Sequence, residues 1–327
     1  MALQGSGQIS FANIENEFGA NGERSLGDYR ISQSVGELSN LPLDSGIPSS
    51  GQIKFSDFYG KKLNVIVDMH SGSTEYRKSA RSDKWNNNNV TVIGGFRSKR
   101  ESGSKIIIHI NKKFGSDKSN VDHVAVKTGS WSAASVQVDI GGEGEVLGAG
   151  GDGGRGGECL NSGESGSTGT SGLGVEHNGL IVNVLSGGII RAGFGGGGGG
   201  GGGRQSDKNA DRRASGGGGG GGAGFPNGSG GAQVGGCGGG GNTGGTNSSD
   251  TVAGDGGSGA NHANQAYGAG GGEGGQFGEN ADNGGSSQAG GGSGGGNGAA
   301  IRRTSGFSVT INNSGTIQGD TSATGVG

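Results

Sequence analysis

The glycine run Gly195–Gly203 constrains the fold of this chain more than any other stretch, and a second run, Gly216–Gly222, follows after a charged insert. Glycine has no side chain to bury, and ordering its backbone costs more entropy than ordering any other residue. Two structures fit such runs. One is a flexible linker without fixed structure. The other is a packed array of extended helices with three residues per turn, which make no internal hydrogen bonds and must bond to their neighbours.

Apolar residues are scarce and unevenly distributed, which divides the chain into regions. Glycine provides 87 of the 327 residues, whereas hydrophobic residues make up only 28% and gather before Ile140, near Leu180–Ile190 and at the C-terminal end. We therefore expect a mainly β and non-regular protein in three parts. These are a small N-terminal module over residues 1–60, an antiparallel β-sandwich-like domain over residues 61–140, and a glycine-rich domain over residues 141–327.

The first part contains an internal repeat, because the segment Ser6–Ile14 returns as Ser50–Phe58. Asn13 and Asp57 occupy equivalent positions in the two copies, where each can cap a helical turn. The two copies predict the paired ends of one compact module.

The second part has the period-two alternation and the β-branched residues that are typical of strands. Lys and Arg outnumber Asp and Glu between Lys61 and Lys127. This excess fits either an anionic partner or a solvated surface that keeps edge strands apart. The predicted strands are Asn64–Met69, Val90–Ile93, Lys105–Ile110, Val121–Lys127 and Ser135–Ile140.

A second repeat links the β part to the glycine part. The pattern of two strand residues, a glycine and a second short strand occurs over Val138–Val146, Val182–Ile190 and Val309–Ile317. We interpret each copy as a hairpin that clamps one end of the glycine region onto the β domain. Between the last two copies glycine runs alternate with polar inserts, which predicts extended segments that reverse direction at the inserts. The flanking repeats and the inserts favour a scaffold over a linker.

Motifs for catalysis and metal binding carry little weight in this sequence. Gly291–Gly295 matches G-x-S-x-G, but the strand–turn–helix context of a hydrolase is missing. Acidic pairs such as Glu143 and Glu145 have no setting that indicates glycoside hydrolysis. The histidines are scattered, so we expect no metal site and no cofactor. With only Cys159 and Cys237, buried free thiols are a better interpretation than a disulfide framework.

The N-terminal segment lacks the basic and apolar regions of a secretion signal, and no stretch is apolar enough to span a membrane. We therefore expect no membrane insertion.

The glycine runs, their polar inserts and the flanking repeat resemble the glycine-rich receptor-recognition adhesins at the tips of bacteriophage long tail fibres of the T-even type. The resemblance covers residues 141–327, and the segment Ser6–Ile14 looks like the N-terminal segments of other phage virion proteins. It implies a sandwich of polyglycine II helices whose distal loops contact the host surface. The N-terminal module and the basic β domain do not resemble the attachment domain of those adhesins.

The resemblance implies a virion protein, made in the host cytoplasm, that is not an enzyme. Its partners would be other tail or fibre proteins, reached through the N-terminal module, and a bacterial surface polysaccharide or outer-membrane protein, with no nucleic acid. The alternative is a structural or assembly protein of the tail or fibre that touches no receptor. By similarity of loop character, receptor contact is expected at Arg204, Arg212, Arg213, Phe225, Asn247, His262, Tyr267 and Phe277.

Overall fold

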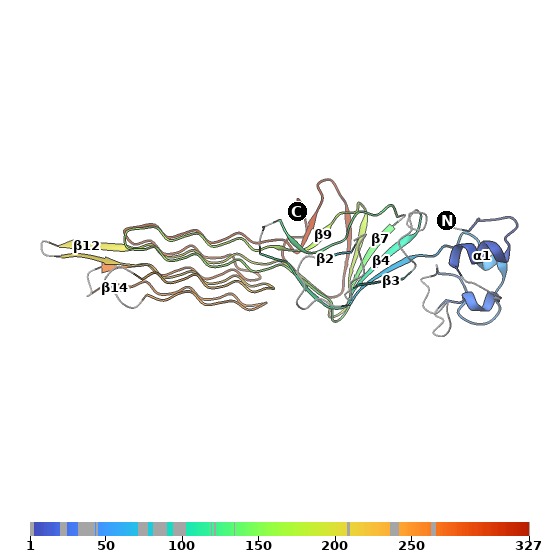
Figure 1. Cartoon of the computed structure of the whole chain (residues 1–327), viewed down its shortest axis with the longest axis horizontal. Helices are drawn as coiled ribbons and strands as arrows, with labels where there is room; N and C mark the ends of the chain where they lie inside the picture. Colours follow the sequence, from blue (N-terminus) through green and yellow to red (C-terminus); the bar gives the residue numbers. More distant parts are fainter. Residues whose placement is uncertain are drawn as a thin grey trace.

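The molecule is elongated, with three parts in a row (Figure 1). The N-terminal module lies at one end, the main sheets lie in the middle, and the glycine-rich segments extend to the other end. The computed structural model describes residues 3–19, 25–31, 43, 45–70, 78–80, 90–93, 103–118, 120, 122–133, 135–207, 210–235, 242–262 and 266–326.

The N-terminal module is built from short helical turns that are capped in the same way. Its helices are α1 (Phe11–Phe18) and the 3-10 turns η1 (Leu26–Tyr29) and η2 (Phe55–Phe58). The side-chain oxygen of Asn13 accepts the backbone N–H of Ser10 at 2.9 Å, and a carboxylate oxygen of Asp57 accepts that of Lys54 at 2.7 Å. Both residues thus take part in capping, but from inside the turn and not before it, because the N-cap residues are Ser10 and Lys54.

The two copies of that repeat share one small aromatic core. Phe18, Tyr29 and Phe58 are buried together with Ile14, and their rings meet at centroid distances of 6.0–6.3 Å. Edge and tilted contacts of this kind suit the charge distribution of aromatic rings.

The middle of the molecule consists of three sheets. Sheet 1 has the order β17-β10-β7-β4-β1-β3, sheet 2 the order β18-β11-β8-β5, and sheet 3 the order β19-β16-β9-β6-β2. Sheet 1 contains β1 (Val65–Met69), β3 (Val90–Ile93), β4 (Lys105–Ile110), β7 (Ser135–Ile140), β10 (Leu180–Val184) and β17 (Val309–Asn313). Sheet 2 contains β5 (Lys113–Gly115), β8 (Glu145–Leu147), β11 (Ile189–Arg191) and β18 (Thr316–Gln318). Sheet 3 contains β2 (Lys78–Ser79), β6 (Val124–Lys127), β9 (Ser171–Val175), β16 (Ile301–Arg303) and β19 (Ala323–Thr324).

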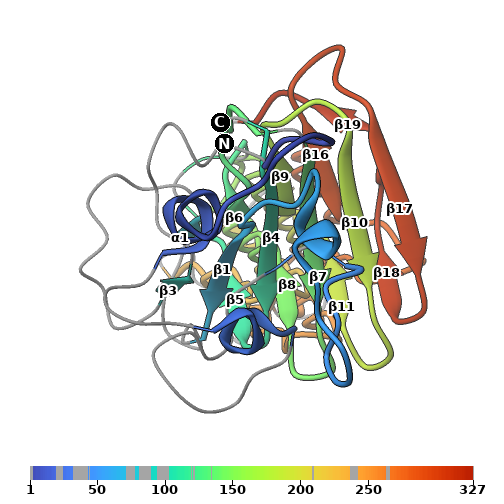
Figure 2. The ribbon, with the colours of Figure 1, turned by 90° about the vertical axis from the view of Figure 1, so that its right-hand side faces the viewer.

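The chain visits the three sheets in a fixed order, so it forms stacked coils with one strand in each sheet. The coils are β4-β5-β6, β7-β8-β9, β10-β11-β16 and β17-β18-β19. Seen from the N-terminal end, the strands of sheet 1 run side by side across the view (Figure 2). The side chains between the sheets form one apolar core, which includes Ile108, Phe114 and Val138.

The expected antiparallel sandwich is wrong, because the strands of these sheets pair in parallel except for β1 with β3. The predicted strands at 90–93, 105–110 and 135–140 are nevertheless observed with those bounds. Alternation of apolar and polar residues indicates one buried face and one exposed face, and it does not reveal the direction of the neighbouring strand. The connections that looked like hairpin loops are corners between two sheets.

The second repeat also forms no hairpins. Its copies pair with one another in parallel: Val182 faces Val138 in sheet 1, and Ile190 faces Val146 and Ile317 in sheet 2. The repeat is therefore the mark of stacked coils. Strands from both sides of residue 141 share these sheets, so the expected boundary at that residue runs through them.

The corner glycine of the repeat lies against the coil before it. A Cβ added at Gly144 would lie 2.1 Å from the carbonyl oxygen of Ile110, and one added at Gly188 would lie 2.4 Å from that of Ile140. Only glycine allows this close approach between coils.

The glycine-rich segments are two insertions between sheet 2 and sheet 3. The first insertion, residues 148–170, connects β8 to β9, and the second, residues 192–300, connects β11 to β16. Both insertions leave the sheets and return to them (Figure 1). The first belongs to the coil β7-β8-β9 and the second to the neighbouring coil β10-β11-β16.

Hydrogen bonding in the run Gly195–Gly203 follows a period of three. Gly196, Gly199 and Gly202 donate to the segment 161–167, Gly197 and Gly200 to the segment 217–220, and Gly198 and Gly201 to the segment 282–285. Carbonyl groups of the same run accept from the segments 154–157, 269–275 and 289–295. The run is therefore surrounded by other backbone segments, which satisfy its polar groups in place of an apolar core.

Candidate functional site

Chain reversals at the end of the glycine region farthest from the sheets form a surface that we call the distal end. It consists of the described residues within 158–161, 203–214, 261–267 and 286–289 (Figure 1). Two hairpins belong to it: β12 (Gly203–Asp207) with β13 (Ala210–Ala214), and β14 (Asn261–His262) with β15 (Ala266–Tyr267).

The hairpins are packed together by small residues. Ala214, Ala260 and Ala266 form a buried cluster, and β15 lies beside β12 and β13. A Cβ added at Gly203 would lie 2.0 Å from the carbonyl oxygen of Tyr267. Glycine and alanine thus allow the two hairpins to lie side by side at the distal end.

The turn 286–289 holds the hairpins in place. The Ser287 hydroxyl donates to the carbonyl oxygen of Tyr267 at 2.5 Å, and the backbone N–H of Arg204 donates to the side-chain oxygen of Gln288. The turn is attached to the glycine run, because the N–H of Ala289 donates to the carbonyl oxygen of Gly202 at 3.0 Å. The distal end is a connected surface.

Five of the eight residues predicted for receptor contact lie at this end. Arg204 and Arg213 face each other across β12 and β13, and Arg212 lies next to them along β13. His262 lies on β14 and Tyr267 on β15, and Tyr267 is 52% exposed. The structure thus brings together residues from two inserts that are far apart in the sequence.

Phe225 lies at the opposite end of the glycine region, where the chain turns back near the sheets. Its N–H donates to the carbonyl oxygen of Gly148 at 2.8 Å, and the Nζ atom of Lys113 lies 4.3 Å from the centre of its ring. A Cβ on Gly115 would lie 2.5 Å from the ring of Phe225. This aromatic ring anchors the glycine region on sheet 2.

Asn247 and Phe277 also lie away from the distal end. The side-chain oxygen of Asn247 accepts the N–H of Gly230 at 2.9 Å. Phe277 is 54% exposed in a turn closed by backbone bonds between Gln276 and Glu279. That turn also approaches the sheets, since the neighbouring Gly275 donates to the carbonyl oxygen of Gly195, the first residue of the run.

Sequence reasoning missed part of the distal end. The turn 286–289 was not recognised as an insert, although its Ser-Ser-Gln-Ala sequence interrupts the glycine pattern. Leu160, in the turn 158–161, was not among the predicted contact residues, and it is 42% exposed at the distal end. The bond from the N–H of Gly202 to the carbonyl oxygen of Asn161, at 3.1 Å, sets the position of that turn.

The expectation of free thiols is wrong for Cys159, which is disulfide-bonded. It lies in the distal turn 158–161 with a φ angle of 54°. Cys237, the other cysteine of the chain, is outside the described residues. A count of two cysteines could not decide between thiols and a bridge, because the deciding factor is their spatial approach.

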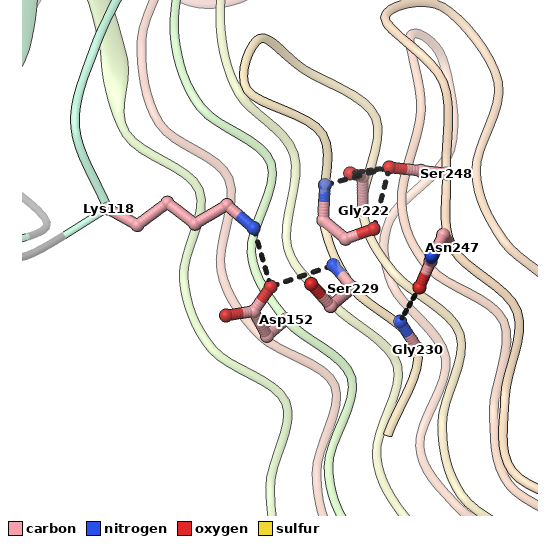
Figure 3. A network of polar contacts seen from close by, with 8 residues as sticks. Lys118, Asp152, Gly222, Ser229, Gly230, Asn247 and Ser248 are labelled. Atoms are coloured by element: carbon pink, nitrogen blue, oxygen red, sulfur yellow. Dashed lines mark hydrogen bonds and ion pairs between the residues drawn. The ribbon is translucent and has the colours of Figure 1, made fainter. Parts of the chain in front are cut away.

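Polar contacts connect the sheets to the base of the glycine region (Figure 3). The Lys118 ammonium, just beyond β5, donates to a carboxylate oxygen of Asp152 at 2.7 Å, and the N–H of Ser229 donates to the same oxygen at 2.7 Å. Nearby, the Ser248 hydroxyl donates to the carbonyl oxygen of Gly222 at 2.6 Å. Burial raises the pKa of Asp152, but the bonds from Lys118 and Ser229 outweigh it, so that the pKa lies below its ordinary value.

We expect Asp152→Asn to lower the free energy of unfolding at pH 7 by roughly 0.5–1 kcal/mol, because the ion pair is partly exposed and screened. A carboxylate with a lowered pKa stabilises the fold above its ordinary pKa of 3.8 and loses this effect as the pH falls through the lowered value. The difference between the variant and the wild type should therefore shrink in acid. Denaturant unfolding at pH 7 and near pH 3 measures it, and Lys118→Gln completes a double-mutant cycle. An equal difference at both pH values would contradict the ion-pair explanation.

Among the described residues, no helix has the length and apolar character needed to cross a bilayer. The family model for the phage tail fibre adhesin Gp38 matches residues 75–322 of the chain. No curated protein and no solved structure matches.

Proposed function

This chain belongs to the phage tail fibre adhesin Gp38 family, since the family model matches more than half of it, and from this premise we propose that its distal end binds the bacterial surface. The observation that carries the proposal is the gathering of exposed loops at the end of the molecule opposite the N-terminal module (Figure 1). Connecting loops on a rigid scaffold are where binding residues concentrate. The chain would act as a virion protein without enzymatic activity.

The scaffold in this proposal is a bundle of polyglycine II helices. The support is the period of three in the hydrogen bonds of Gly195–Gly203, which is the period of this left-handed helix. A helix that bonds to neighbours on several sides cannot bend independently of them. Loops fixed on such a bundle lose less entropy on binding than free loops.

The contact residues in this proposal are Arg204, Arg212, Arg213, His262 and Tyr267. Arg204 and Arg213 lie directly opposite each other on two antiparallel strands, which gathers basic side chains at the distal end. Arginine and tyrosine are also the residue types that dominate the energy of many binding surfaces. The receptor would be a surface polysaccharide or an outer-membrane protein that offers anionic groups.

The N-terminal module would attach the chain to the tail fibre. It lies at the opposite end from the proposed receptor surface (Figure 1), which leaves the distal end free to face outward. Its repeat and its own aromatic core make it a compact unit.

Competition for the host surface tests this function. The purified chain, added to host cells before the phage, should occupy the receptors and reduce adsorption in a dose-dependent way. The same chain with the insert 203–214 replaced by a Gly-Ser loop is the control and should not compete. If the purified chain neither binds cells nor slows adsorption, while phage without it fail to assemble, the chain is instead a structural or assembly protein.

A further inference from the structure

One end of the stacked coils is open. The last coil consists of β17, β18 and β19, and each of these strands is the edge of its sheet. Within the part of the chain that the structure describes, no strand pairs with their outer edges. The three strands lie together on one side of the molecule (Figure 2).

On this side the backbone of β17 presents hydrogen-bonding groups that no described strand pairs with. The N–H of Ser314 donates to the carbonyl oxygen of Val184 at 2.7 Å, and N–H directions alternate along a strand. Thr310 and Asn312 therefore also direct their N–H and C=O groups to β10. Val309, Ile311 and Asn313 direct theirs outward, away from the sheet.

The apolar core is also unfinished at this end. Ile311 and Ile317 continue the rows of Val182 and Ile190, which are fully buried at 0% exposure, but they are only partly buried themselves. Another coil placed on this end would cover both. The burial of apolar surface would then add to the backbone hydrogen bonds.

The lysine and proline residues that often protect an edge strand are missing here. Native edges carry lysine, proline or inward-pointing charges that prevent pairing with other chains. Between Val309 and Val326 there is no lysine and no proline, and Asp320 is the only charged residue. Charge and proline therefore do not block pairing along β17, the longest of the three edge strands.

We propose that a second copy of this chain binds this end through β17, with antiparallel pairing centred on Ile311. A partner must present strand edges around an apolar core of the same cross-section, and the same end of a second copy meets this requirement. Antiparallel pairing about a two-fold axis at Ile311 lets the two copies of this residue exchange both hydrogen bonds. Val309 of each copy then faces Asn313 of the other. The proposal is independent of the receptor-binding function.

The mass of the full-length chain in solution tests the proposal, measured by sedimentation over a range of concentrations. The wild type should be a dimer that dissociates on dilution. Thr310→Lys combined with Asn312→Lys should give a monomer, because the pairing would place the two introduced ammonium groups opposite each other at both positions. Ala232→Lys with Gln233→Lys adds the same charge on exposed positions of the glycine region and should stay a dimer.

Hydrogen exchange of the wild type gives a second readout that does not depend on the folding of a variant. The outward amides of Ile311 and Asn313 should exchange slowly at concentrations that favour the dimer and quickly after dilution. A wild type that is monomeric at all concentrations would overturn the proposal and leave a fibre protein as the occupant. A dimer that persists in the lysine variant, or fast exchange of both amides in the dimer, would overturn it as well.

Discussion

Replacing Gly198 by alanine is expected to lower the free energy of unfolding by about 1–3 kcal/mol, the usual cost of overpacking. The new Cβ would lie 2.0 Å from the carbonyl oxygen of Gly292 and 2.8 Å from the nitrogen of Gly284. Both atoms belong to backbone segments that are themselves hydrogen-bonded to the run, so they cannot move away without breaking bonds. Replacing Gly201 as well, with its Cβ 2.1 Å from the carbonyl oxygen of Ala289, should increase the loss.

Gly290→Ala is the matched control within the same region. Its Cβ would have the Ser162 hydroxyl oxygen as its nearest neighbour, at 3.7 Å. Because alanine reduces the entropy of the unfolded chain, this variant should be neutral or more stable by about 0.4–1 kcal/mol. Thermal and denaturant unfolding of the variants measures both signs. A flexible linker would respond in the same way at both positions, and that result would contradict a packed bundle.

The sequence predicted the strands of the sheets better than their arrangement. Alternating residues located β4 and β7 with their observed bounds, because the alternation depends only on which face is buried. The parallel pairing was missed since it depends on which coil lies next to which. The repeat at Val138–Val146 and Val182–Ile190 indicated which coils are neighbours, because repeated segments with the same internal spacing of apolar residues and glycine stack on one another. It was interpreted as hairpins because a single copy looks like two strands and a turn.

The candidate site was also predicted only in part, because its arrangement depends on which chain segments lie side by side. The polar inserts were recognised as chain reversals, but successive reversals of a chain that runs out and back lie at opposite ends. Arg204 and Tyr267 therefore lie at the distal end, whereas Phe225 and Phe277 lie at the base of the glycine region. If each glycine run crosses the region once, successive inserts must lie at alternate ends, so the order of the inserts in the sequence could have indicated which ones are distal. The contacts that hold the distal end, such as the one between Ser287 and Tyr267, depend on passes far apart in the sequence and could not be predicted.

Exposed apolar side chains at the two ends of the glycine region allow a direct test of which end binds the host. Tyr267 at the distal end and Phe277 at the base are exposed to a similar degree, 52% and 54%. Tyr267→Ala and Phe277→Ala therefore remove similar aromatic surface and should have similarly small effects on stability. A difference in host binding between the two variants would therefore be due to the location of the side chain, distal end or base, so Phe277→Ala is the matched control.

We expect phage that carry Tyr267→Ala to adsorb at least 10-fold more slowly, because an aromatic residue at the centre of a binding surface typically contributes 2 kcal/mol or more. Arg212→Ser with Arg213→Ser should have a comparable effect and should make adsorption less sensitive to salt, since charged contacts are screened by ions. Phe277→Ala should adsorb like the wild type. Adsorption rates at two salt concentrations, measured on particles shown to be assembled, decide the matter. A loss with Phe277→Ala and none with the distal variants would place the contact at the base of the glycine region, where the chain meets the sheets, and would contradict binding through the distal end.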